Sequence, residues 1–353
     1  GMSEYGAGGS PFQHQYPNPG TGGNGSSNHP EEFQNKSHER HLSVINRTPW
    51  FWGTSLWAGF DFASDGRKEG DQAGINDKGL VTHDRAVTKD AYHLYRANFT
   101  KDDGVVYICS RRFAQRDNSV PVAVYANGTS VILRVNGKTY STTRDKDIPL
   151  FTTNNNVTLK NGANIIEAST LYKGKEYTDH AVWYVGTPDN TVIPANGDTS
   201  MTINAAIEGT YTCQLYYTAS DNTPLELSAN GYTAKHVFGA STGSEARMIS
   251  VNLYLKEGSN TVTLSLPNGQ GVNIQKATFY LYHDGQPYLH DNDLQELIPI
   301  PNNPNPEYDG ATSVAAVQTG HNTAISETEY DLNGRVSKQA NGIIIHNGKK
   351  TIR

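Results

Sequence analysis

The stretch that decides the expected fold runs from Trp50 to Phe62 and reads WFWGTSLWAGFDF. Its density of aromatic and apolar residues favours a buried strand. A helical pattern precedes it, from about Pro30 to Asn46, and opens with a proline and two glutamates that suit a helix N-terminus. A second helical pattern follows from about Lys89 to Asn98. This alternation predicts an α/β arrangement over the first hundred residues.

The periodicity of the two helical patterns also predicts which faces they bury. In the first helix the expected buried stripe contains Phe33, Ser37, His41, Val44 and Ile45. In the second helix the residues expected to point inward are Ala91, Leu94 and Tyr95.

The pattern changes at about Val105, where short segments separated by turn signals begin. Val131, Leu133 and Val135 alternate with polar neighbours, as expected of a half-buried strand. The Asn136-Gly137 pair that follows marks a hairpin turn. The region of about 104–187 is therefore predicted to be an immunoglobulin-like β-sandwich.

A second all-β region follows from about 198 to 283. Its expected strands are YTCQLYYTA, LELSANG, MISVNLYLKEGSNTVTLSL and VNIQKATFYLY. The Pro- and Asn-rich stretch IPIPNNPNPEYDG then predicts a semi-rigid linker. The last segment, from ETEYDLNGR to the end, carries strand-turn-strand signals.

The composition excludes several classes of protein. Charged residues are 18% of the 353 and the formal net charge is −6, which indicates an extracellular β-rich protein without a basic nucleic-acid footprint. The apolar runs are far shorter than a membrane span. Cys109 and Cys213 are expected to be buried free thiols, although a disulfide stays open. The histidines show no metal-ligand spacing, so neither a metal nor another cofactor is predicted.

Four motifs in the first 113 residues resemble the end of the catalytic domain of glycoside hydrolase family 2. They are SEYGAGGSPFQHQ, HPEEFQ, WGTSLWAGFDFASDGRKEGD and NDKGLVTHDRAVTKDAYHLYRANF, in family order. The resemblance is strongest to the β-galactosidase type. It implies that the sequence opens at the seventh strand of a (β/α)8 barrel, with residues 50–62 as the eighth strand and the two helices as the seventh and eighth helices.

By the same resemblance, Glu4 matches the catalytic nucleophile and Trp57 the aromatic residue that stacks on the sugar. A retaining glycosidase needs a second carboxylate as acid and base. In the family this is a glutamate after an asparagine on the fourth strand, and no Asn-Glu pair occurs in this sequence. The resemblance therefore implies a β-galactosidase-like activity for a longer protein and an inactive chain on its own.

The tripeptide from Asn76 to Lys78 leaves a second specificity open. Asn-x-Lys at this place resembles the motif with which β-glucuronidases read the substrate carboxylate, where the lysine supplies a point charge. The surrounding NDKGLVT is also similar to β-galactosidase-like members. Glucuronidase specificity is therefore the minor alternative.

The second all-β region is similar to carbohydrate-binding modules of the family 6 and 35 type, through LYLKEGSNTVTLSLPNGQGVNIQKATFYL. The resemblance implies glycan contacts from Tyr232 and Asn273. A structural sandwich without a ligand stays open, as does a spacer role for the first sandwich. The chain end, YDLNGR and GIIIHNGKKTIR, resembles C-terminal segments of secreted Bacteroidetes proteins, although an ordinary hairpin is the alternative.

Together these observations predict a multidomain α+β protein: an incomplete (β/α)8-barrel remnant, then an immunoglobulin-like and a carbohydrate-binding-module-like jelly-roll sandwich. The expected domains are 1–103, 104–187, 188–290 and a linker with a sorting-like segment at 291–353. The protein is expected to be secreted, periplasmic or at the cell surface, and Gly1 before Met2 indicates a residue left by tag removal.

The expected partners are a β-galactoside or related glycan and either the missing barrel portion or a second copy of the chain. Two barrel strands cannot close a barrel, so part of the aromatic stretch should stay uncovered. The residues expected to face solvent are Trp50, Trp52, Leu56 and Phe60. A non-catalytic carbohydrate-binding protein is the alternative function.

Overall fold

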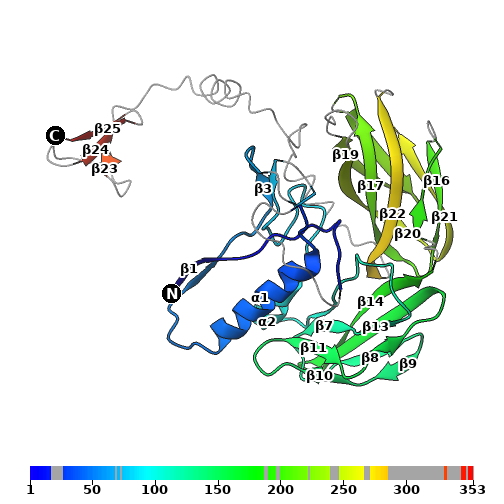
Figure 1. Ribbon diagram of the computed structural model, residues 1–353, viewed down its shortest axis with the longest axis horizontal. Helices are drawn as coiled ribbons and strands as arrows, with labels where there is room; N and C mark the ends of the chain where they lie inside the picture. The colour runs from blue at the N-terminus through cyan, green and yellow to red at the C-terminus, as the bar shows by residue number, and fades with distance from the viewer. Residues whose placement is uncertain are drawn as a thin grey trace. The chain divides into compact units, whose positions relative to one another are not determined.

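The computed structural model describes residues 1–16, 27–67, 70–71, 74–186, 190–195, 199–221, 223–238, 246–265, 271–284, 330–331, 343–346 and 349–352. The chain divides into two compact units, Gly1–Asn305 and Pro306–Arg353. Within the described ranges most elements are strands and no sheet closes into a barrel (Figure 1). The predicted linker after 290 lies outside these residues.

Residues 1–103, called here the N-terminal region, contain one parallel and one antiparallel strand pair. Strand β1 (Met2–Tyr5) pairs in parallel with β2 (Thr54–Leu56), and helix α1 (Glu31–Asn46) connects them in sequence. Strand β3 (Phe62–Ala63) pairs antiparallel with β4 (Ile75–Asn76). Helix α2 (Asp90–Phe99) lies beside α1 (Figure 1). The predicted strand-helix alternation is confirmed for β1, α1 and β2.

The predicted position of α1 is confirmed, but its predicted buried face is wrong. Val44, expected inside, is 41% exposed. The buried face is mostly polar because its side chains have partners in distant segments: Glu31 pairs with Arg112, and Glu39 accepts a 2.8 Å hydrogen bond from Tyr125. The residues that this face buries are Glu31, Glu32, Gln34, Asn35, His38, Glu39 and Leu42. The inward placement of Ala91 and Leu94 in α2 is confirmed, and Tyr95 is half-buried.

The aromatic stretch gives a shorter and more exposed strand than expected. Its longest paired segment is Thr54–Leu56, which pairs with β1, while Phe60 forms a single bridge with Val81 and Phe62 begins β3. Trp50 is 77%, Trp52 90% and Phe60 49% exposed. The prediction of a buried strand is therefore wrong, whereas the expectation that these three residues face solvent is confirmed. Leu56 is half-buried instead.

Residues 104–186, called here the first double sheet, form two four-stranded sheets. The sheet orders are β10-β11-β7-β5 and β14-β13-β8-β9, and a short pair, β12-β6, lies beside them. The strands are β5 (Val106–Ile108), β6 (Ser119–Val120), β7 (Ala123–Ala126), β8 (Ile132–Val135), β9 (Lys138–Tyr140), β10 (Thr142–Arg144), β11 (Leu150–Thr153), β12 (Val157–Thr158), β13 (Gly162–Tyr172) and β14 (Lys175–Val185).

Two sequence predictions in the first double sheet are confirmed. Val131, Leu133 and Val135 are buried in one apolar core, to which both sheets contribute. Asn136 and Gly137 have φ angles of 49° and 81°, so they form a two-residue hairpin turn between β8 and β9.

Residues 190–284, called here the second double sheet, also form two four-stranded sheets, ordered β15-β22-β17-β20 and β16-β21-β18-β19. Apolar residues from both sheets fill one large core. The strands are β15 (Thr191–Val192), β16 (Ser200–Ala205), β17 (Gly209–Ala219), β18 (Thr223–Ala229), β19 (Tyr232–Phe238), β20 (Arg247–Leu255), β21 (Gly258–Ser265) and β22 (Val272–Asp284).

The two cysteines are free and buried, as predicted. Cys109 belongs to an apolar cluster that the N-terminal region and the first double sheet share. Cys213 belongs to the core of the second double sheet. Burial raises the pKa of both thiols.

The second unit contains a three-stranded sheet, which confirms the strand-turn-strand signals of the chain end. Strand β24 (Ile343–His346) pairs antiparallel with β23 (Tyr330–Asp331) and with β25 (Lys349–Ile352). His346 pairs with Lys349 where the last two strands come closest in sequence.

Candidate active site

Glu4 and Trp57 lie at the same end of two adjacent parallel strands. Tyr5 pairs with Leu56, and the backbone N–H of Trp57 donates a 2.8 Å hydrogen bond to the carbonyl of Tyr5. The strands therefore place the exposed Glu4 near the start of the Trp57 segment. Gly6 follows closely: a Cβ there would lie 2.0 Å from the carbonyl oxygen of Trp57, so only glycine fits.

The other two predicted residues, Asn76 and Lys78, lie beside the Trp57 segment. The Trp57 ring is 42% exposed and meets Phe62 edge-on at 5.8 Å, and Phe62 pairs with Asn76 between β3 and β4. The backbone N–H of Ala58 donates a 3.0 Å hydrogen bond to the carbonyl of Lys78. The peptide bond between Trp57 and Ala58 is cis. The structure thus places the three segments that carry Glu4, Trp57, Asn76 and Lys78 next to one another.

Asn76 and Lys78 differ in how far they are available to a ligand. Asn76 is 2% exposed, and its Oδ1 accepts a 3.1 Å hydrogen bond from the backbone N–H of Lys78. The Lys78 side chain is half-buried. Lys78 is therefore the cation of this loop that can reach an acidic group, while Asn76 shapes the turn that carries it.

A buried ionic network that sequence reasoning missed supports the loop of residues 76–79. The Lys89 Nζ lies 2.8 Å from Asp61 Oδ1 and donates to the carbonyl of Asp77 at 2.8 Å. Asp61 also accepts a 2.7 Å hydrogen bond from the Gly79 N–H. The Asp77 carboxylate lies 2.8 Å from His29 Nδ1. The spacing of these residues along the sequence gives no sign that they meet.

Burial raises the pKa of two carboxyl groups near this loop, those of Asp61 and Asp71. It raises the pKa of Asp61 to about 7, although the neighbouring Lys89 charge lowers that pKa in part. Burial also raises the pKa of Asp71, whose carboxylate accepts a 2.7 Å hydrogen bond from the Ser10 hydroxyl. Both carboxyl groups therefore take up protons at a higher pH than exposed aspartates do.

The loop of residues 6–16, which follows Glu4, is held on several sides. The Gly9 N–H donates to the carbonyl of Asp77 at 3.1 Å, and the Ser10 N–H donates to the carbonyl of His29 at 2.8 Å. The His14 ring lies 3.1 Å from the Glu32 carboxylate and stacks on Phe113. These contacts fix the position of the segment that follows Glu4 in the sequence.

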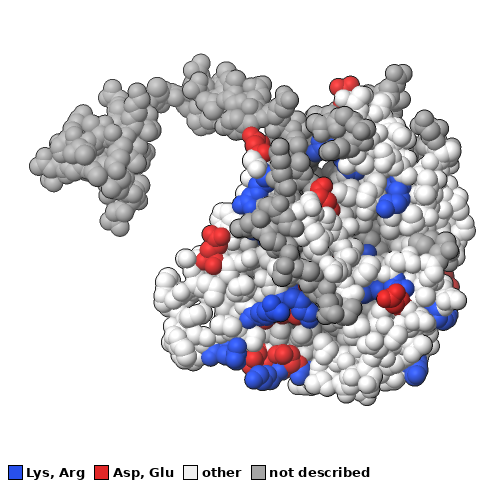
Figure 2. All heavy atoms as spheres, viewed as in Figure 1, with Lys and Arg blue, Asp and Glu red and all other residues white. Residues whose placement is uncertain are grey.

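Charge and metal chemistry add no further site within the described ranges. No cluster of three or more His, Cys, Asp or Glu residues that could hold a metal ion occurs there. No helix in those ranges is long and apolar enough to cross a membrane. Figure 2 shows lysine, arginine, aspartate and glutamate interspersed among uncharged residues on the visible face.

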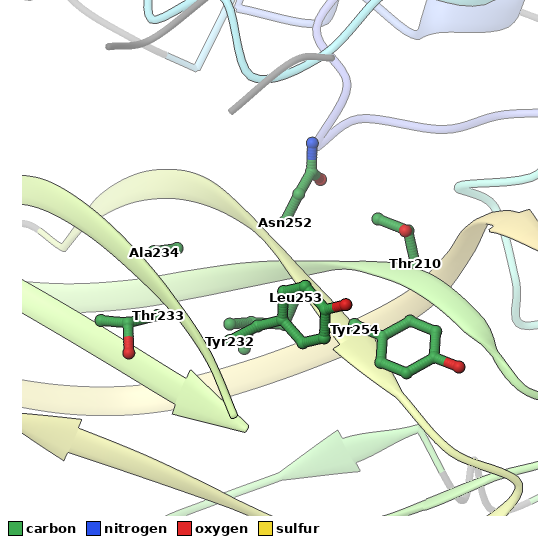
Figure 3. Close-up of a pocket in the computed structure, with 7 residues that line it drawn as sticks. All are labelled: Thr210, Tyr232, Thr233, Ala234, Asn252, Leu253 and Tyr254. Atoms are coloured by element: carbon green, nitrogen blue, oxygen red, sulfur yellow. The ribbon is translucent and has the colours of Figure 1, made fainter. Parts of the chain in front are cut away.

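The second double sheet has a shallow pocket that includes Tyr232. Its empty volume is about 270 Å³, which includes space open to solvent. The rings of Tyr232 and Tyr254 lie 5.3 Å apart, and Asn252 points away from them (Figure 3). The lining residues are Thr210, Tyr232, Thr233, Ala234, Asn252, Leu253 and Tyr254.

The structure does not bring Tyr232 and Asn273 together. Tyr254, beside Tyr232, pairs with Thr210 of β17, whereas Asn273 pairs with Thr218 of the same strand. Thr210 and Thr218 are eight residues apart, so the two places are separated by roughly 26 Å along the strand. The two residues predicted to contact a glycan therefore lie in different sheets and toward opposite ends of the second double sheet.

Comparisons with known proteins find relatives for part of the chain. It is 37% identical over 189 residues to a protein of Bacteroides fragilis named "Beta-glucuronidase", covering 51% of this chain and 26% of the relative. It is 28% identical over 224 residues to a Formosa agariphila protein named "Putative beta-glucuronidase", covering 58% of this chain and 26% of the relative. The chain thus spans about a quarter of the length of these curated relatives. No family model matches it.

Among solved structures, a protein from Bacteroides fragilis named "putative beta-galactosidase" is 34% identical to this chain. The match covers 52% of this chain and 28% of that protein, with a TM-score of 0.49. The chain is therefore homologous in part to a protein named β-glucuronidase.

Proposed function

We propose that this chain is the C-terminal part of a retaining β-glycosidase in which Glu4 is the nucleophile and Trp57 the sugar-stacking residue. The observation that carries the proposal is the parallel pairing of β1 with β2, which sets the exposed Glu4 beside the Trp57 segment. Catalytic carboxylates of barrel enzymes lie at such strand ends. The partial homology to a protein named β-glucuronidase supports the same class.

In the proposed reaction, the Glu4 carboxylate attacks the anomeric carbon while the glycosidic oxygen leaves with a proton from a second carboxyl group. Water then attacks the glycosyl-enzyme, giving its proton to that second group and restoring Glu4. Near the candidate site, Asp61 and Asp77 are paired with Lys89 and His29. We therefore propose that the proton donor comes from polypeptide that this chain does not include.

The same proposal covers the architecture. In it, the N-terminal region is the last part of a (β/α)8 barrel, the first double sheet is an immunoglobulin-like spacer and the second double sheet is a jelly roll. The exposed Trp50, Trp52 and Phe60 support an uncovered barrel wall. Export of the protein, to the periplasm, cell surface or medium, belongs to the proposal through the resemblance of the chain end, and cell fractionation would test it.

The test of the nucleophile is covalent labelling of the completed protein. The chain would be joined to the barrel portion encoded upstream and treated with dinitrophenyl 2-deoxy-2-fluoro-galactoside and the corresponding glucuronide. Mass spectrometry should find one added sugar on the peptide that contains Glu4, and none in the Glu4→Gln variant. A label on another carboxylate would remove Glu4 from its proposed role.

Specificity has two candidates, and a specific observation favours each. The sequence resemblance favours β-galactosides. The half-buried Lys78 beside Trp57 and the names of the curated relatives favour β-glucuronides, because an ammonium group attracts the substrate carboxylate. If glucuronides are the substrate, Lys78→Met in the completed protein should lower kcat/KM for a nitrophenyl glucuronide roughly 100-fold, which corresponds to the loss of about one hydrogen bond between charged groups. An unchanged galactoside rate would accompany that loss.

One observation favours a second role, which is glycan binding by the second double sheet. Tyr232 and Tyr254 form an aromatic pair at a pocket, and aromatic faces suit sugar rings. A glycan array probed with the full chain and with Tyr232→Ser would test this role. Binding that survives the substitution would place any glycan site elsewhere.

A further inference from the structure

The sheet β15-β22-β17-β20 of the second double sheet is buried on both faces. One face fills the apolar core with residues such as Cys213 and Leu215. The alternate residues of β17 point to the other face and are also buried, with Thr212 at 0% and Gln214 at 4% exposure. From β20, Asn252 at 1% joins this second, polar face. A sheet of a freely tethered module would leave that face in water.

The N-terminal region covers part of the polar face, and Arg112 of the first double sheet lies over Tyr280 on the same face. Gln214 Nε2 donates a 2.9 Å hydrogen bond to the carbonyl of Pro11. The neighbouring Tyr216 ring meets Phe12 edge-on at 6.1 Å. Both contacts hold the loop of residues 6–16, which follows Glu4.

A second loop is held by the same face. Asn252 Nδ2 donates a 3.2 Å hydrogen bond to the carbonyl of Ala86, and Asn252 Oδ1 accepts a 2.7 Å bond from Thr212. The Tyr282 hydroxyl lies 2.7 Å from Thr88 Oγ1. These contacts hold the loop of residues 82–88.

The loop of residues 82–88 is tied in turn to the segment after Trp57. Val81 forms a bridge with Phe60, and the Arg85 guanidinium lies 4.1 Å from the centre of the Phe60 ring. The Asp61 N–H donates a 2.8 Å hydrogen bond to the carbonyl of Val81. The two held loops thus border the candidate site on the Glu4 side and on the Trp57 side.

We infer that the second double sheet is a positioning element for the candidate site, with Gln214 and Asn252 as the residues that fix its two bordering loops. Each amide is buried, so its hydrogen bond is made without competition from water, and its loss removes a direct tie between the sheet and the loop. The inference rests on the proposed function only in taking Glu4 and Trp57 as parts of an active site. The ordering of the loops by this face stands apart from catalysis.

Hydrogen exchange of the full chain, followed by mass spectrometry, tests the inference without any activity. Gln214→Leu should speed exchange roughly tenfold in peptides that cover residues 7–16, and Asn252→Leu should do the same for residues 80–90. Each variant should leave the other loop unchanged. Peptides from the cores of β17 and β20 report that the second double sheet stays folded.

Matched controls make the same chemical changes at exposed places. Gln275→Leu on β22 and Asn204→Leu on β16 are both exposed and should leave both loops unchanged. Tyr216→Ser, at a half-buried position, provides a milder variant that should loosen residues 7–16 if Gln214→Leu does not fold. Unchanged loop exchange in folded variants, or equal acceleration across the chain, would overturn the positioning role.

Kinetics of the completed protein separate this inference from the proposed function. Gln214→Leu and Asn252→Leu should raise KM several-fold with a smaller change in kcat, because they disorder the rim and leave Glu4 in place. Selective loop exchange with no glycoside turnover in any variant would sink the glycosidase proposal and support the positioning role. Glycoside turnover together with unchanged hydrogen exchange in both loops would support the glycosidase proposal and overturn the positioning role.

Discussion

The N-terminal region and the second double sheet bury their interiors in different ways. The second double sheet has an apolar core to which both of its sheets contribute. The N-terminal region contributes Leu42, Leu94 and Ala97 to a cluster that it shares with the first double sheet. Its remaining buried contacts are largely ionic and polar. The region that carries the candidate site therefore depends on neighbouring parts for its buried contacts. The second double sheet draws most of its core from its own two sheets, to which Ala114, Val182 and Tyr184 of the first double sheet are added.

The largest expected effect comes from breaking the ionic cluster between the N-terminal region and the first double sheet. Arg112 is buried between the carboxylates of Glu31 and Asp90. Arg112→Leu leaves both carboxylates without this partner and should lower the free energy of unfolding by about 3–5 kcal/mol. Denaturant unfolding measures the loss, and hydrogen exchange should locate it in α1 and α2. A loss that appears equally in the second double sheet would contradict the comparison.

A cavity in the second double sheet should have a smaller and differently placed effect. Leu215 is fully buried in its core, so Leu215→Ala should cost about 3 kcal/mol. Exchange should quicken in β17, β20 and β22 and change least in α1. Leu171→Ala, at a 63% exposed position, is the matched control and should stay within about 0.5 kcal/mol of the unchanged chain.

Acid should loosen the N-terminal region through His38. Burial, with the His41 and Lys89 charges, lowers the pKa of His38 from 6.5 to about 3. Between these pH values the unfolded chain binds a proton that the folded chain does not, so stability falls as the pH drops. At pH 5 this one histidine should cost about 2 kcal/mol.

His38→Gln should remove that part of the acid loss. The free energy of unfolding would be measured at pH 7 and pH 5 for the variant and for His283→Gln, an exposed control. The difference between the two pH values should shrink for His38→Gln and stay the same for the control. An equal acid loss in both variants would mean that other groups carry it.

The smallest effect is expected at the exposed tryptophans. Trp52 is 90% exposed, so Trp52→Ser should change the stability of the isolated chain by less than about 0.5 kcal/mol. If the aromatic surface covers itself with a second copy, light scattering should show a concentration-dependent mass that the substitution reduces. A constant monomer mass in both proteins would count against self-pairing.

Local signals in the sequence predicted the elements better than their environments. Asn136 and Gly137 specify their hairpin turn within two residues, and the residues from 30 to 46 specify a helix. The buried face of α1 could not be predicted because Glu31 and Glu39 are buried by Arg112 and Tyr125, which lie about eighty residues further along. Apolar periodicity carries no information about such partners.

The candidate site shows the same division. The family resemblance predicted Glu4, Trp57, Asn76 and Lys78, and the structure places the segments that carry them next to one another. No local pattern in the sequence predicts the ionic network of Asp61, Lys89 and His29. The same holds for the hydrogen bonds from the second double sheet to the two loops. Tyr232 and Asn273 were paired by analogy, and the length of β17 separates them.

The two buried thiols give the molecule a built-in pair of reporters. Cys109 sits in the cluster shared by the N-terminal region and the first double sheet, and Cys213 in the second double sheet. Because each sulfur is shielded and its pKa is raised, a thiol reagent reacts only when its own neighbourhood opens. The alkylation rates of Cys109 and Cys213 in the unaltered protein can therefore report separately how often each part opens.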